Sequence, residues 1–132
     1  MIRASRIATS TAAISVAIST AVFGSLPALA QERTGTWVGA SGHSATGTVS
    51  IVEDGGTYRV VFSDDWSVDR APDPHIAFGS ASAFEKGTDW ALIEASGAQS
   101  VAVPEGIDPS RFEAAWVWCK RFGVPLASAS LN

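Results

Sequence analysis

Apolar and polar residues alternate along most of the chain after residue 30, in short runs separated by Gly, Asp and Pro. The clearest case is GTVSIVEDGGTYRVVF at 47–62, where two alternating runs flank Asp54-Gly55-Gly56. A period of two predicts strands with one buried face, and a DGG step is typical of a tight hairpin turn. The pattern therefore predicts a β-hairpin over these residues.

Three further segments, 75–81, 89–95 and 98–104, predict strands because they are apolar, short and bounded by turn residues. The stretch SDDWSVDRAPDP at 63–74 is expected to be an exposed acidic loop that crosses between strands. The predicted fold class is all-β: an antiparallel β-sandwich-like single domain.

Local signals disagree over 111–122. Ser110 and Glu113 have the spacing of a helix capping box, and Gly123 would end a helix. The bulky residues at 116–118, WVW, favour a strand instead. Pattern alone leaves both structures open for this segment.

The first thirty residues have the features of a secretory signal peptide. Arg3 and Arg6 precede a charge-free apolar stretch that ends in ALA at 28–30. Serines and threonines interrupt this stretch, which falls short of the roughly 18 apolar residues of a membrane span. We expect residues 1–30 to be removed and 31–132 to be a single domain, exported to the periplasm or the extracellular space.

The charge of the remaining domain excludes some partners. Residues 31–132 carry seven Lys and Arg against thirteen Asp and Glu, a net charge of −6. An acidic domain repels nucleic acid and anionic membrane, so we expect neither as a partner once the signal is cleaved. A single cysteine, Cys119, allows no internal disulfide.

Three motifs together resemble one known family. They are HSATGTV at 43–49, DPHI at 73–76 and WCKRFGVP at 118–125, the last with Ala129 and Leu131 behind it. The chain resembles the DM-thirteen domain family over nearly all of Gly35–Leu131, and the C-terminal motif is the most specific part. One departure is the extra proline in the PDP step before His75.

The resemblance implies a β-sandwich-like domain of exported proteins with a role in electron transfer. It also implies that the single cysteine acts either as a free thiol or as a ligand of a prosthetic group such as haem. It favours a strand over 114–122.

Cys119 has two interpretations. Both the strand and the helix place its sulfur among apolar residues, where free cysteine is often a small buried hydrophobe. In that case the domain is a non-catalytic envelope or cell-surface binding module. The other interpretation is a redox centre at Cys119, for which Arg121 is the nearby cation that would favour the thiolate.

The two histidines are the other soft ligands. His43 with Cys119 would make a possible pair of ligands for haem or a metal, and His75 is a weaker candidate. One His and one Cys do not complete a zinc site, and a His, His, Cys copper site would lack its methionine. Aspartates 64, 65, 69 and 73 offer a calcium ion some carboxylates, but their spacing matches no EF-hand.

Other chemistry has little support. No G-x-S-x-G elbow and no nucleotide-binding glycine motif occurs. Most of the five tryptophans, Trp116 and Trp118 among them, are expected in the core, whereas Trp66 falls in the loop that is expected to be exposed. The sequence therefore leaves two function classes, a redox domain and a binding module, with a redox protein or an envelope protein as the expected partner.

Overall fold

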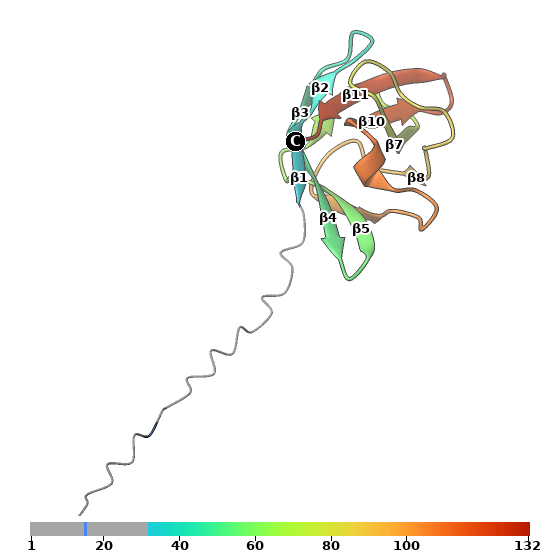
Figure 1. Cartoon of the computed structure of the whole chain (residues 1–132). Helices are drawn as coiled ribbons and strands as arrows, with labels where there is room; N and C mark the ends of the chain where they lie inside the picture. Colours follow the sequence, from blue (N-terminus) through green and yellow to red (C-terminus); the bar gives the residue numbers. More distant parts are fainter. Residues whose placement is uncertain (1–14, 16–31) are drawn as a thin grey trace, which may run out of the picture.

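The computed structural model describes Ser15 and residues 32–132, so the predicted signal peptide and its cleavage site lie outside the described residues, apart from Ser15. The described domain is made almost entirely of short strands and one turn of 3-10 helix (Figure 1). In chain order these elements are β1 (Arg33–Thr36), β2 (Val38–Gly39), β3 (Ala45–Thr46), β4 (Thr48–Asp54), β5 (Thr57–Phe62), β6 (Ser67–Val68), β7 (Pro74–Gly79), β8 (Ala91–Leu92), β9 (Gln99–Ala102), η1 (Pro109–Arg111), β10 (Ala114–Cys119) and β11 (Val124–Ser130). The all-β prediction is confirmed.

Two antiparallel sheets make up the sandwich. One has the strand order β1-β4-β5-β9 and the other β2-β11-β10-β7-β8, while β3 and β6 form a separate two-stranded ribbon. The chain changes sheets at Trp37, because β1 pairs with β4 and the next strand, β2, pairs with β11. The predicted hairpin is the β4–β5 pair, which projects at one end of the domain with Gly55 and Gly56 in its turn (Figure 1).

The core lies between the sheets and follows from their alternation. In β4 and β5 the buried residues are every second one: Val49 and Ile51, then Val60 and Phe62. Strand β7 is different, since four consecutive residues from Ile76 to Gly79 are buried. Such a strand is covered on both faces, which fits its continuous apolar sequence.

Cross-strand contacts close the domain around its C-terminus. The backbone N–H of Asn132 donates to Thr34 O at 3.0 Å, so the last residue lies beside β1 (Figure 1). Arg33 reaches across from β1 and donates to the carbonyl oxygens of Pro109 and Phe112 at 3.0 and 2.9 Å. These bonds join the N-terminal strand to the segment that enters β10.

Three local predictions need correction. The segment 89–95 forms only the two-residue strand β8, because its pairing with β7 ends at Ile93 N, which donates to Pro74 O, and the next amide, Glu94 N, donates to the side chain of Gln99. The helix alternative for 111–122 is wrong, since β10 runs from Ala114 to Cys119. Ser110 and Glu113 do not form the predicted capping box. Asp108 caps the short η1, and Glu113 accepts a hydrogen bond from Ala81 N.

The position of Trp66 also differs from the prediction. It lies in the predicted acidic loop but is only 1% exposed, and its ring packs 5.0 Å from the rings of both Trp37 and Phe62. Its Nε1 donates to Glu94 O at 3.0 Å, so the polar edge is satisfied. The loop is therefore anchored from within the core.

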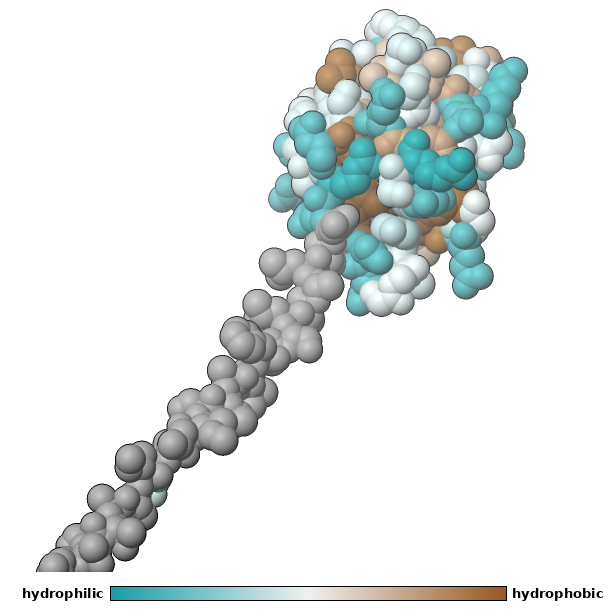
Figure 2. All heavy atoms as spheres, in the orientation of Figure 1, coloured by the Kyte–Doolittle hydropathy of each residue, from teal (hydrophilic) through white to brown (hydrophobic). Residues whose placement is uncertain are grey.

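The surface of the domain is mixed. On the face drawn in Figure 2, hydrophilic side chains are interspersed with small hydrophobic areas. Among the residues described, no helix has the length and apolar content that crossing a bilayer requires.

Candidate functional site

Cys119 is the last residue of β10, and it pairs with a residue of each neighbouring strand. It pairs with Pro74 of β7 on one side and Val124 of β11 on the other. The chain then turns through Gly123, whose φ of 64° is in the left-handed region and whose N–H donates to Cys119 O at 2.9 Å. The residue is 1% exposed and belongs to the main hydrophobic core.

The same cysteine lines a cavity of about 630 Å³, which we call the thiol pocket. The other lining residues come from three loops and from β11: His43, Arg70, Ala71, Pro72, Phe122, Val124 and Leu126. The walls are mostly apolar, and Phe122 is 64% exposed at the β10–β11 turn. Cys119 borders the cavity although it is only 1% exposed, so the residue contributes a small part of the wall and is shielded from a folded partner.

A bulge shapes one wall of the thiol pocket. The register between β10 and β11 shifts after Val117, so that Val117 faces Ala127 and Trp118 faces Pro125. Leu126 is the extra residue, and its carbonyl accepts a hydrogen bond from Ala40 N at 2.9 Å. Pro125 has no N–H to donate, and a bulge is a place where a sheet tolerates proline.

His43 is held with one nitrogen committed. Its Nδ1 lies 2.9 Å from the carbonyl oxygen of Asp69, and the side chain is 13% exposed. A carbonyl oxygen only accepts, so Nδ1 must carry the proton, and in the neutral ring Nε2 then keeps a free lone pair. Histidines that bind metals are usually oriented in this way, by a hydrogen bond from the second nitrogen to a carbonyl or carboxylate.

Two loops are tied together at His43. Ser44 N donates to the Asp69 carboxylate at 2.9 Å, and the Arg70 guanidinium donates to Gly42 O at 2.9 Å. Both loops contain a strained residue, since Ser41 and Arg70 have φ values of 54° and 47°. Left-handed backbone is costly for residues other than glycine, so surrounding contacts must hold it in place.

The carboxyl group of Asp69 is the electrostatic centre of this junction. Its pKa is lowered, first by the hydrogen bond from Ser44 N and then by the nearby charges of Arg70 and His43. A lowered folded-state pKa means that this carboxylate stabilises the fold above its ordinary pKa of 3.8, and that the contribution is lost as the pH falls below it.

Asp69→Asn is therefore expected to weaken the acid dependence of stability. Wild-type protein should lose stability between about pH 5 and about pH 3, and the variant should lose less over the same interval. Urea denaturation midpoints at the two pH values measure the difference. Asp64→Asn, another exposed carboxylate of the same loop, is the charge-matched control, and an equal flattening in that variant would contradict the assignment to Asp69.

The structure brings together two of the residues predicted from sequence and adds a cation that the sequence did not predict. Cys119 and His43 line the same pocket, whereas His75 lies outside it with Nε2 3.0 Å from Asp73 Oδ1. The sequence nominated Arg121 as the cation near the thiol, but β10 ends before it and Arg121 is exposed in the turn. The cation in the pocket is Arg70, 49 residues before Cys119 in the sequence.

The aspartates of the acidic loop have separate partners. Asp69 bonds to Ser44, Asp73 to His75, and Asp65 Oδ1 to the hydroxyl of Ser63. Over the residues that the structure describes, no group of three or more His, Cys, Asp or Glu side chains lies close enough to hold a metal ion. Any metal or metal-bearing group in the thiol pocket would therefore have few protein ligands.

The types of residue that line the pocket suit an apolar electron-carrying group. A thiolate and a neutral imidazole are both ligands that proteins use for haem iron. Arg70 offers a guanidinium, which pairs well with carboxylates, and the remaining walls are largely apolar. Such a group would supply one-electron chemistry, and Cys119, His43 and the apolar walls are the parts of the pocket that would hold it.

The fold and the pocket define a small β-sandwich domain with a single buried thiol at a cavity shared with a histidine. A family comparison agrees: the family described as Electron transfer DM13 matches residues 38–131. The chain belongs to this DM13 family, as its sequence motifs predicted, and the match supports a role in electron transfer. Comparisons with curated proteins and with solved structures found no match.

Proposed function

We propose that this domain transfers electrons at the thiol pocket, with Cys119 and His43 as the residues that hold an electron-carrying group. The observation that carries the proposal is that the single cysteine and the oriented histidine border one cavity of about 630 Å³. That volume lies within the roughly 300–1,000 Å³ that is usual for small-molecule sites.

The burial of Cys119 selects between two forms of redox chemistry. Exchange with a protein disulfide requires the thiolate to reach the attacked sulfur directly. A residue that is 1% exposed at the edge of a pocket is poorly placed for that reaction. A group that enters the pocket needs less exposure of the residue than a folded partner does, so ligation of a prosthetic group is favoured over a freely reacting thiol.

Export of the domain is part of the proposal and rests on the N-terminal sequence. The pattern of two arginines, an apolar stretch and an ALA cleavage site supports a signal peptide over residues 1–30. The expected location is the periplasm or the extracellular space, and the expected partner is another redox protein of the envelope.

One observation favours a second function. Cys119 belongs to the main hydrophobic core, which is also what a purely structural cysteine would do. The domain would then be an envelope binding module in which the thiol only packs. The two functions differ in what replacing the sulfur does to ligand binding.

Titration of the mature domain with ferric haem tests the proposal. Wild-type protein is expected to give a saturable Soret shift, and Cys119→Ser and His43→Ala should each weaken haem binding at least about tenfold. Loss of a residue that only orients a metal ligand already has an effect of this size, and these variants remove the ligand itself. His75→Gln alters the other histidine, outside the pocket, and should bind as the wild type does.

Two results would contradict the proposal. One is wild-type protein that binds no haem and whose thiol reacts with a small alkylating reagent only after unfolding. The other is equal haem binding by wild type and Cys119→Ser, both folded by circular dichroism. Either result would favour the binding module.

A further inference from the structure

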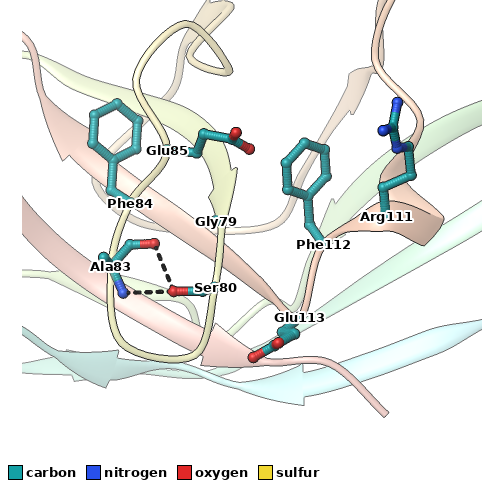
Figure 3. Close-up of a pocket in the computed structure, with 8 residues that line it drawn as sticks. All are labelled: Gly79, Ser80, Ala83, Phe84, Glu85, Arg111, Phe112 and Glu113. Atoms are coloured by element: carbon teal, nitrogen blue, oxygen red, sulfur yellow. Dashed lines mark hydrogen bonds between the residues drawn. The ribbon is translucent and has the colours of Figure 1, made fainter.

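A second cavity, of about 540 Å³, shares no lining residue with the thiol pocket. It lies between the loop that follows β7 and the residues that join η1 to β10 (Figure 3). The loop returns closely over Gly79: a Cβ there would collide with the backbone of Ala83 and Phe84. We call this cavity the loop pocket.

Two aromatic rings line the loop pocket, and both are held by other rings. Phe84 stacks on Trp118 with centroids 4.3 Å apart, and Phe112 stacks on Phe78 at 5.3 Å. Each of the two lining residues is half-buried. Each therefore uses one face for packing and keeps part of its ring toward the cavity.

Two carboxylates complete the walls. In Figure 3 the Glu85 side chain lies between the two phenyl rings, and Glu113 lies below them. Glu113 accepts from Ala81 N through Oε2 at 3.1 Å, which fixes its position and leaves the other oxygen available. Within residues 32–132 neither carboxylate takes part in an ion pair.

Arg111 is the one cation among the lining residues, and its charge is partly engaged elsewhere. The pKa of Asp108 is lowered mainly by hydrogen bonds from Ser110, and the charge of Arg111 contributes to that lowering. Figure 3 shows the Arg111 side chain beyond Phe112, on the side away from Glu85. The space between the rings is therefore left with an excess of negative charge.

We propose that the loop pocket binds an organic cation, an alkyl chain that carries a guanidinium or ammonium group. The positive group would lie against Phe84 and Phe112, where the faces of aromatic rings attract cations, and would pair with Glu85 and Glu113. The net charge of −6 on the domain also attracts a cation at long range. This site shares no lining residue with the thiol pocket, and the proposal does not rest on electron transfer.

Amide chemical-shift titrations of the mature domain at low salt test this inference. Agmatine is the free cation, Gly-Arg-Gly amide presents the same group on a peptide, and butylurea is the neutral control. Agmatine is expected to shift the amides of residues 79–85 and 111–113, and butylurea is not. Stronger binding of the tripeptide would assign the site to a basic side chain of a partner, and stronger binding of agmatine to a free small molecule.

Three variants should change the affinity for agmatine, two by lowering it and one by raising it. Glu85→Gln and Glu113→Gln should each weaken agmatine binding about twofold to fivefold, the range of a partly exposed ion pair, and the glutamine at 113 keeps an acceptor for Ala81 N. Arg111→Gln should strengthen it, while Glu105→Gln, at a different cavity, should change nothing. Absence of binding, equal binding of butylurea, or weaker binding by Arg111→Gln would overturn the proposal.

Discussion

Trp66→Ala is expected to cost the domain about 3–5 kcal/mol of unfolding free energy, the usual range for truncating a buried aromatic side chain. Trp66 is 1% exposed and packs against Trp37 and Phe62 at the point where the chain changes sheets. The substitution also removes the hydrogen bond from Nε1 to Glu94 O, which keeps a second donor in Gln99 Nε2. A domain of this size has about 5–15 kcal/mol in total, so much of its stability would be lost.

Urea denaturation followed by circular dichroism measures this effect. Trp90→Ala is the matched control, because Trp90 is only half-buried although its Nε1 also donates to a backbone carbonyl, that of Ala102. We expect a clearly smaller loss for Trp90→Ala. Equal losses in the two variants would contradict the central packing role of Trp66.

Gly39→Ala is expected to have the second largest effect, about 3 kcal/mol, at the upper end of the usual range for overpacking. A Cβ on Gly39 would collide with the carbonyl group of His43, which is backbone and has no side-chain rotation to relieve the contact. The loop must move, and the imidazole moves with it. We therefore expect a loss of stability together with weaker ligand binding in the thiol pocket.

Gly106→Ala separates this collision from a general effect of removing glycine. A Cβ on Gly106 has open space around it, and the backbone there does not need a positive φ, so its stability should change by less than about 1 kcal/mol. Denaturation midpoints and a haem titration on both variants make the comparison. A Gly39→Ala protein as stable as Gly106→Ala would contradict the close approach of β2 and His43.

Local pattern predicted the parts of the fold in which neighbours in sequence are also neighbours in space. The β4–β5 hairpin follows from alternation and a glycine turn, and Cys119 in apolar company follows from the residues around it. The same rules misplaced Trp66, because the aspartates beside it signal a turn and say nothing of one side chain pointing inward.

The candidate site was predicted only in part. His43 and Cys119 were paired through chemistry and the family motifs, but Arg70 was missed, because it reaches the thiol pocket through contacts between the loops at 40–44 and 69–73. Residues 26 to 28 positions apart make these contacts, and no spacing rule connects them. The left-handed backbone conformation of Arg70 could not be predicted either, because residues other than glycine rarely adopt it.

The two cavities have different chemistry. The thiol pocket contains a sulfur, an imidazole and mostly apolar walls, whereas the loop pocket contains two phenyl rings and two carboxylates. Trp118 connects the two pockets, because it precedes Cys119 in the chain and its ring stacks on Phe84. Variants of one pocket should therefore be checked for effects on the other.

Film voltammetry on residues 31–132, purified from cells that make the full chain together with whatever group the domain acquires there, tests the central claim most directly. The account predicts a reversible one-electron wave for wild-type protein and no such wave for Cys119→Ser, with both proteins folded by circular dichroism. A silent wild-type protein, or an identical wave from Cys119→Ser, would contradict electron transfer at Cys119.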